Sequence, residues 1–270
     1  MKRSDIVKLS ILGLLVMIAY VPTFRWMIDR WTGIETYYSH GFLVLPISIF
    51  LVWQKRKLLS KLRVKPQPIG WLFFGLGILL HTISMSLKVY FSSGFSLLFV
   101  VMGLVLLFFG KECLKQLAFP IGFLLFMLPL PLVVIANMAF RLKIFAAQAA
   151  TAIVRMMGVP IVREGSLIRT MHAHLMVENP CSGIRSLIAL IALGALMAYF
   201  SNTSRVKKAV LFVSSVPIAV GANVIRIVAL TLASEMYGSD FAMGWFHDTM
   251  GILVFVFAFL GLSMVNRLLE

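Results

Sequence analysis

The chain has 270 residues, of which 60% are hydrophobic and only 13% are charged, and its mean hydropathy is +0.97. Soluble domains carry charged residues at roughly a quarter of their positions. The apolar residues also stand in long runs. This composition excludes ordinary soluble enzyme folds and predicts an integral membrane protein, in which the net charge of +15 first indicates loop orientation rather than nucleic-acid binding.

Several apolar segments approach the length of about 20 residues that crosses a bilayer as a helix. The first lacks an A-x-A-like cleavage site before Pro22, so we interpret it as a retained helix rather than a signal peptide. The fifth contains Pro120, Pro129 and Pro131, which predict kinks or partial unwinding. The sequence predicts one all-α multispanning domain over 1–270 with about eight transmembrane helices, at 6–24, 41–54, 70–87, 93–109, 117–136, 182–200, 209–232 and 247–265.

The basic residues are divided unevenly between the two ends of these helices. Clusters at 55–65 and 205–208 fall at the same end as the amino terminus, and that end holds most of the 25 Lys and Arg residues. Basic loops tend to stay in the cytoplasm. We therefore predict a multi-pass protein of the cytoplasmic (inner) membrane with both termini in the cytoplasm.

One long segment, 137–180, is predicted on the extracytoplasmic side. Its first half places apolar residues such as Met138 and Leu142 near one face and Arg141 elsewhere, which is typical of an amphipathic helix lying on the membrane. Its second half has β-branched runs around Gly165, which predict a small β-hairpin before the sixth helix.

Cys181 is the candidate nucleophile. Asn179 is a favoured N-cap and Pro180 a favoured first helical residue, so Cys181 would lie in the first turn of the sixth helix. The free backbone N–H groups and the helix dipole there favour a thiolate. Arg185 would add a cation one turn later. The alternative is a small buried residue, as most cysteines are; we assign the other cysteine, Cys113, to the cytoplasmic edge.

Arg226 stands within an apolar run. A guanidinium at a helix centre costs roughly 2.5–3.5 kcal/mol on insertion scales, so its presence indicates a functional site. The alternative is a side chain that reaches the outer interface. Asn223, one turn earlier, could orient the guanidinium or bind a peptide backbone.

His247 opens the eighth helix on the predicted outer side and is followed by Asp248, which we expect to contact the substrate. An imidazole can take a proton from a thiol and return it to a leaving amine. His40, also at an outer helix end, is a second candidate base or a substrate contact. His172 and His174 alternate on the predicted hairpin, but two histidines without a third ligand do not make a metal site, and we expect no metal and no cofactor.

Four blocks of the sequence resemble the exosortase and archaeosortase family. They are YSHGFLVLP at 38–46, PCSGIRS at 180–186, ANVIRI at 222–227, and His247-Asp248 with Gly251. The isoelectric point of about 10.3 favours the bacterial exosortases over proteins of halophilic archaea, which tend to be acidic.

The resemblance implies a membrane cysteine peptidase and transpeptidase of exported proteins. Its substrates would carry a carboxy-terminal sorting signal, often Pro-Glu-Pro (PEP-CTERM), then a transmembrane helix and a basic cluster. The family's catalytic Cys, Arg and His would be Cys181, Arg226 and His247, and a glutamate of the motif could pair with Arg185, Arg163 or Arg169.

Two other classes of function stay open. A transporter or channel could use Arg226 to bind an anionic substrate, and a scaffold for envelope polysaccharide assembly would need no chemistry. Loss of Cys181 would leave both intact, which separates them from the enzyme.

Overall fold

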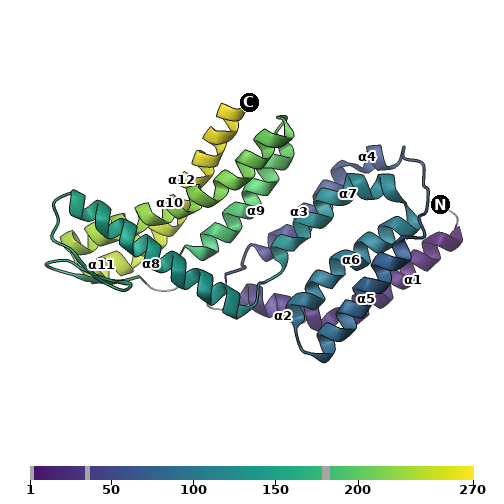
Figure 1. Ribbon diagram of the computed structural model, residues 1–270, viewed down its shortest axis with the longest axis horizontal. Coiled ribbons are helices and arrows are strands. Elements are labelled where there is room, and N and C mark those ends of the chain that lie inside the picture. Colours follow the sequence, from purple (N-terminus) through teal and green to yellow (C-terminus); the bar gives the residue numbers. More distant parts are fainter. Residues whose placement is uncertain (1–2, 34–36, 178–182) are drawn as a thin grey trace. The chain divides into compact units, whose positions relative to one another are not determined.

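The computed structural model describes residues 3–33, 37–177 and 183–270 (Figure 1). The chain divides into two compact units, Met1–Leu130 and Pro131–Glu270. Both are mostly helical, which agrees with the predicted class. The single domain over 1–270 stays a prediction.

The first unit is a set of helices without strands among its described residues. Its helices are α1 (Arg3–Ala19), α2 (Val21–Thr32), α3 (Gly41–Gln54), α4 (Arg56–Leu59), α5 (Gly70–Ser86), α6 (Tyr90–Phe108), α7 (Lys111–Phe123) and the short 3₁₀ helix η1 (Leu124–Met127).

Helices α5 and α6 lie side by side in this unit (Figure 1). Glycines allow the close approach: a Cβ added at Gly103 would lie 2.5 Å from the Phe74 backbone nitrogen, and one at Gly77 would lie 2.8 Å from that of Val100. Small residues at such crossings let two helix backbones pack closely in a membrane.

The second unit combines helices with a small sheet. Its elements are α8 (Leu132–Met156), β1 (Val162–Glu164), β2 (Leu167–Arg169), β3 (His174–Met176), α9 (Ile184–Phe200), α10 (Arg205–Tyr237), α11 (Ser239–Met243) and α12 (Trp245–Leu269).

The predicted hairpin is present and has one strand more than expected. Strands β1 and β2 pair antiparallel around Gly165, whose φ of +63° suits a glycine, and β3 pairs antiparallel with β2. Ile168 and Leu175 are fully buried or nearly so against α8 and α10. The sheet therefore has one apolar face, which packs on the helices.

Two apolar clusters hold the helices of the second unit. One joins α8, the sheet and α10 and includes Val154, Ile227 and Leu230. The other joins α9, α10 and α12 and includes Leu190 and Leu262. Helix α10 belongs to both clusters, so it is the central element of this unit.

The predicted count of eight transmembrane helices is not confirmed. Four described helices, α6, α8, α10 and α12, are long and apolar enough to cross a membrane, and α1 with α2 makes a fifth candidate if the bent pair is one span. Helices α3, α5 and α9 are apolar but shorter. The multi-pass character stands, with four to five candidate spans.

The predicted span at 6–24 breaks at Tyr20, where α1 and α2 meet at 56°. Pro22 lies in the first turn of α2, where a missing N–H costs little. Tyr20 is fully buried, its hydroxyl lies 2.6 Å from Ser96 Oγ, and its ring stacks on His81. The contacts of Tyr20 therefore stabilise the bend between α1 and α2.

The predicted span at 117–136 is not one helix. Helix α7 ends at Phe123, η1 ends at Met127, and α8 begins only at Leu132. Pro129 and Pro131 lack N–H donors, which explains the interruption. Helix α8 then extends through the segment predicted to be amphipathic, so that helix exists but begins earlier than expected.

Candidate functional site

Helix α10 carries Arg226 in the interior of the second unit. The residue is 7% exposed, although its helix is a candidate membrane span. It lies roughly 16 Å from the end of α10 at Tyr237, at 1.5 Å per residue. The guanidinium turns to a neighbouring helix rather than to the surface.

The partner of Arg226 is His247, in the first turn of α12. Arg226 Nη2 donates to His247 Nε2 at 3.0 Å and to the His247 carbonyl oxygen at 3.2 Å. Gly251 lies one turn further along α12, and a Cβ added there would be 3.4 Å from the same Nη2. Two helices distant in sequence thus bring the predicted cation and the predicted base into contact.

This contact determines which nitrogen of His247 carries its proton. A guanidinium only donates hydrogen bonds, so we assign Nε2 as the acceptor and Nδ1 as the protonated nitrogen. Nδ1 lies 3.4 Å from Oδ1 of Asp248, an exposed carboxylate. Arg226 and Asp248 therefore contact different nitrogens of the same imidazole.

Asn223, one turn before Arg226, packs against Gly183. A Cβ added at Gly183 would lie 2.5 Å from Asn223 Cγ, so a larger residue cannot stand there without displacement. Gly183 has φ +77°, a left-handed conformation that favours glycine. Asn223 thereby supports the backbone just before α9.

The predicted start of the sixth helix is wrong. The described helix α9 begins at Ile184, directly after Gly183 in its left-handed conformation. Asn179, Pro180 and Cys181 lie outside the described residues, so the predicted nucleophile stays a prediction.

Two predicted substrate contacts, Arg185 and His40, lie in different units of the chain. Arg185 is exposed in the first turn of α9. His40 belongs to the first unit, where its ring stacks on Tyr38 and burial lowers the pKa of its imidazole. Their roles in substrate binding stay predictions.

His172, which lies between β2 and β3, makes a contact that the sequence did not indicate. His172 Nδ1 lies 2.8 Å from a carboxylate oxygen of Glu235 near the end of α10, and the His172 backbone N–H donates to the other oxygen at 3.2 Å. His174 is exposed on β3. Within the described ranges, no three His, Cys, Asp or Glu side chains come together as metal ligands.

Cys113 offers a contrast to a reactive thiol. It is buried in α7 of the first unit, and this burial raises the pKa of its thiol. A thiolate is the reactive form of cysteine, so Cys113 is poorly suited to attack a carbonyl.

Sequence reasoning missed the supports around the site. Gly183 and Gly251 are the positions where Asn223 and Arg226 approach another backbone, and only their place in the quoted blocks pointed to them. The assembled groups can transfer a proton through His247 and donate hydrogen bonds to developing negative charge through Arg226.

The family comparison covers both units. The family model described as transmembrane exosortase matches residues 26–264. No curated protein and no solved structure matches the chain. Because the matched region spans most of the 270 residues, this chain belongs to the transmembrane exosortase family, whose members are membrane cysteine peptidases and transpeptidases that process sorting signals.

Proposed function

We propose that this protein cleaves the carboxy-terminal sorting signal of exported proteins by acyl transfer through Cys181. The observation that supports it best is the hydrogen bond between buried Arg226 and His247 Nε2, at 3.0 Å. A buried cation beside a proton-transferring side chain is costly to maintain in a membrane protein, and such residues are functional by default.

The first half of the reaction forms a thioester. The Cys181 thiol gives its proton to His247 Nε2, and the sulfur attacks the scissile carbonyl carbon of the substrate. The tetrahedral intermediate then collapses, the C–N bond breaks, and the leaving amine takes the proton from His247. The substrate's own helix leaves with that amine, and the exported part stays on the sulfur.

The Arg226–His247 hydrogen bond couples the two catalytic roles. Once Nε2 accepts a proton it can no longer accept from Arg226, and two cations then face each other. The guanidinium is released toward the oxyanion at the step where that charge develops. One oxyanion donor contributes about 2.7–4 kcal/mol in soluble enzymes.

The second half of the reaction resolves the thioester. Water or an amine of an acceptor molecule attacks the thioester carbonyl, gives its proton to His247, and releases the Cys181 thiol. Water as acceptor makes the protein a protease, and an amine makes it a transpeptidase. Asp248 helps to hold the imidazole with Nδ1 protonated.

The substrates in this proposal are exported proteins that end in a short motif such as Pro-Glu-Pro, a transmembrane helix and a basic tail. Asn223, Arg185 and His40 contact the signal. The site faces the extracytoplasmic side of the inner membrane, consistent with the basic bias of the loops at the opposite helix ends.

The test uses a tagged substrate of this kind produced together with the protein. We expect Cys181→Ala and Cys181→Ser to leave the substrate at its precursor size, and the matched control Cys113→Ala to process it normally. Normal processing by both Cys181 variants would refute the nucleophile and return attention to a transporter or scaffold.

A further inference from the structure

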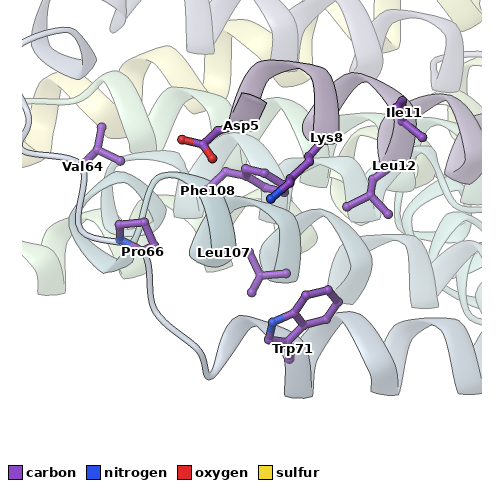
Figure 2. Close-up of a pocket in the computed structure, with 9 residues that line it drawn as sticks. All are labelled: Asp5, Lys8, Ile11, Leu12, Val64, Pro66, Trp71, Leu107 and Phe108. Carbon is purple, nitrogen blue, oxygen red and sulfur yellow. The ribbon is translucent and has the colours of Figure 1, made fainter. Parts of the chain in front are cut away.

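The first unit contains a hollow of about 540 Å³ at one end of its helices (Figure 2). The start of α1, the start of α5 and the end of α6 line it together with the segment at 64–66. Its volume is within the range of small-molecule sites, about 300–1,000 Å³. None of the acyl-transfer residues proposed above lines it.

The body of this hollow is apolar and its edge is charged. Leu12, Leu107 and Trp71 form walls, and Trp71 is 60% exposed. Lys8 extends from α1 toward Phe108 in Figure 2, and Asp5 lies on the same helix. The site therefore suits an amphiphile with an apolar chain and a polar head.

The surrounding charge favours an anionic head. Arg63 and Lys65 flank Val64 of the wall and are exposed, as is Lys8. Asp5 is the one acidic side chain among the lining residues and is half-buried. Basic pockets between transmembrane helices on the cytoplasmic side are typical sites for anionic lipid head groups, and this end is the predicted cytoplasmic one.

The wall at 64–66 is fixed before any ligand binds. The Gln67 N–H donates to the Leu106 carbonyl at 2.9 Å, and Lys65 forms a β-bridge with Gly110. Gly110 has φ +87° and leaves no room for a Cβ against the Lys65 carbonyl. A rigid wall lowers the ordering cost of binding.

The position of the hollow indicates that its ligand comes from the bilayer. Helix α6 is a candidate membrane span, so its end lies where bilayer lipids are the nearest neighbours. The volume holds no more than about one turn of a helix that is 10–12 Å across. A second protein helix is therefore too large, whereas an acyl chain fits.

We propose that this hollow binds an anionic phospholipid of the surrounding bilayer, with an acyl chain between Leu12, Leu107 and Trp71 and the phosphate near Lys8. This site is independent of the acyl-transfer chemistry proposed above.

A second hollow supplies an internal control. It has about 510 Å³, lies on the other side of Val64, and is lined by Leu59, Leu62 and Cys113 among others. In the described part of the chain no charged side chain lines it. The two hollows are similar in size, and only the first has a basic side chain, Lys8, among its described lining residues, so only the first should select for an anionic head.

The experiment uses native mass spectrometry to measure the lipid that the full-length protein retains in detergent. Phosphatidylglycerol and phosphatidylcholine with identical acyl chains are compared. We expect the wild type to retain phosphatidylglycerol preferentially and Lys8→Gln to lower that preference about fivefold. Leu12→Trp fills the hollow, Trp71→Ala removes an exposed wall, and each should reduce retention of phosphatidylglycerol. Asp5→Asn should keep or raise the preference.

The controls separate this site from general apolar surface. Leu59→Trp fills the second hollow, and Leu14→Trp adds an indole to an exposed position of α1. Both should retain phosphatidylglycerol like the wild type. Equal retention of the two lipids by the wild type, an unchanged preference in Lys8→Gln, or equal losses in Leu12→Trp and Leu59→Trp would overturn the proposal.

Discussion

The two units differ in the partners of their buried polar side chains. In the first unit, neutral groups bond to one another: Thr23 Oγ1 lies 2.6 Å from Ser93 Oγ, and His81 Nδ1 lies 2.8 Å from the same hydroxyl. In the second unit, the buried Arg226 contacts His247 on another helix. Hydrogen-bonded neutral side chains cost little free energy to bury. Burying a cation costs much more free energy, so a buried cation indicates a functional site.

This contrast predicts that substitutions of the Arg226–His247 pair reduce activity, whereas substitutions in the buried neutral network of the first unit reduce stability. The largest effect is expected for His247→Ala, since loss of general acid–base catalysis costs about 10²–10⁴-fold in rate. The measurement is the rate of substrate processing by purified protein. The control is His174→Ala, which changes an exposed histidine of β3.

Added imidazole distinguishes a proton-transfer role from a structural one. It should restore part of the rate to His247→Ala and none to Cys181→Ala. If His247→Ala keeps the wild-type rate, His247 is not the base and the contrast between the units fails.

Arg226→Lys is expected to cost about 10²–10³-fold in rate, because a point charge cannot reproduce the planar fork of the guanidinium. Thermal unfolding should show that the variant still folds. Arg141→Lys, on an exposed position of α8, is the matched control. Full activity of Arg226→Lys would reduce Arg226 to a counter-charge without a geometric role.

Gly183→Ala tests the support beneath the segment that precedes α9. An L residue in the left-handed region costs about 1–3 kcal/mol, and the new Cβ would also meet Asn223. We expect the rate of substrate processing by purified protein to fall about tenfold or more. An unchanged rate in Gly183→Ala would show that this packing does not position the catalytic segment.

Ser93→Ala tests the first unit. It removes the hydroxyl shared by Thr23 and His81, which should lower the free energy of unfolding by about 1–3 kcal/mol. The processing rate per folded molecule should stay at the wild-type value, and the exposed control Ser86→Ala should change neither quantity. A large loss of rate without a loss of stability would erase the distinction between the units.

Much of the helical pattern could be predicted from hydropathy, and the errors have physical causes. The apolar run at 6–24 is continuous in sequence, but the packing of Tyr20 on Ser96 and His81 bends it, and such long-range contacts leave no local signal. At 117–136 the prolines predicted kinks or partial unwinding, and the chain is indeed not helical between Met127 and Leu132, so the error was to count one span there. The third strand was missed because its pairing depends on β2.

The candidate site was predictable in its parts but not in its geometry. A cation in an apolar run and a histidine at a helix start can be recognised from sequence alone. Their contact cannot, because it depends on how α10 packs against α12. The start of α9 was placed too early since Asn179 and Pro180 form a good capping pattern, whereas the left-handed Gly183 places the first turn after them.

The central claim is that Cys181 carries the acyl group of the substrate, and intact mass spectrometry of the protein with a sorting-signal substrate tests it most directly. The account predicts an adduct with the mass of the exported part of the substrate, located on Cys181, released by hydroxylamine as a thioester would be, and missing from Cys181→Ala. Substrate processing that continues in Cys181→Ala, or an adduct located on another residue, would contradict it.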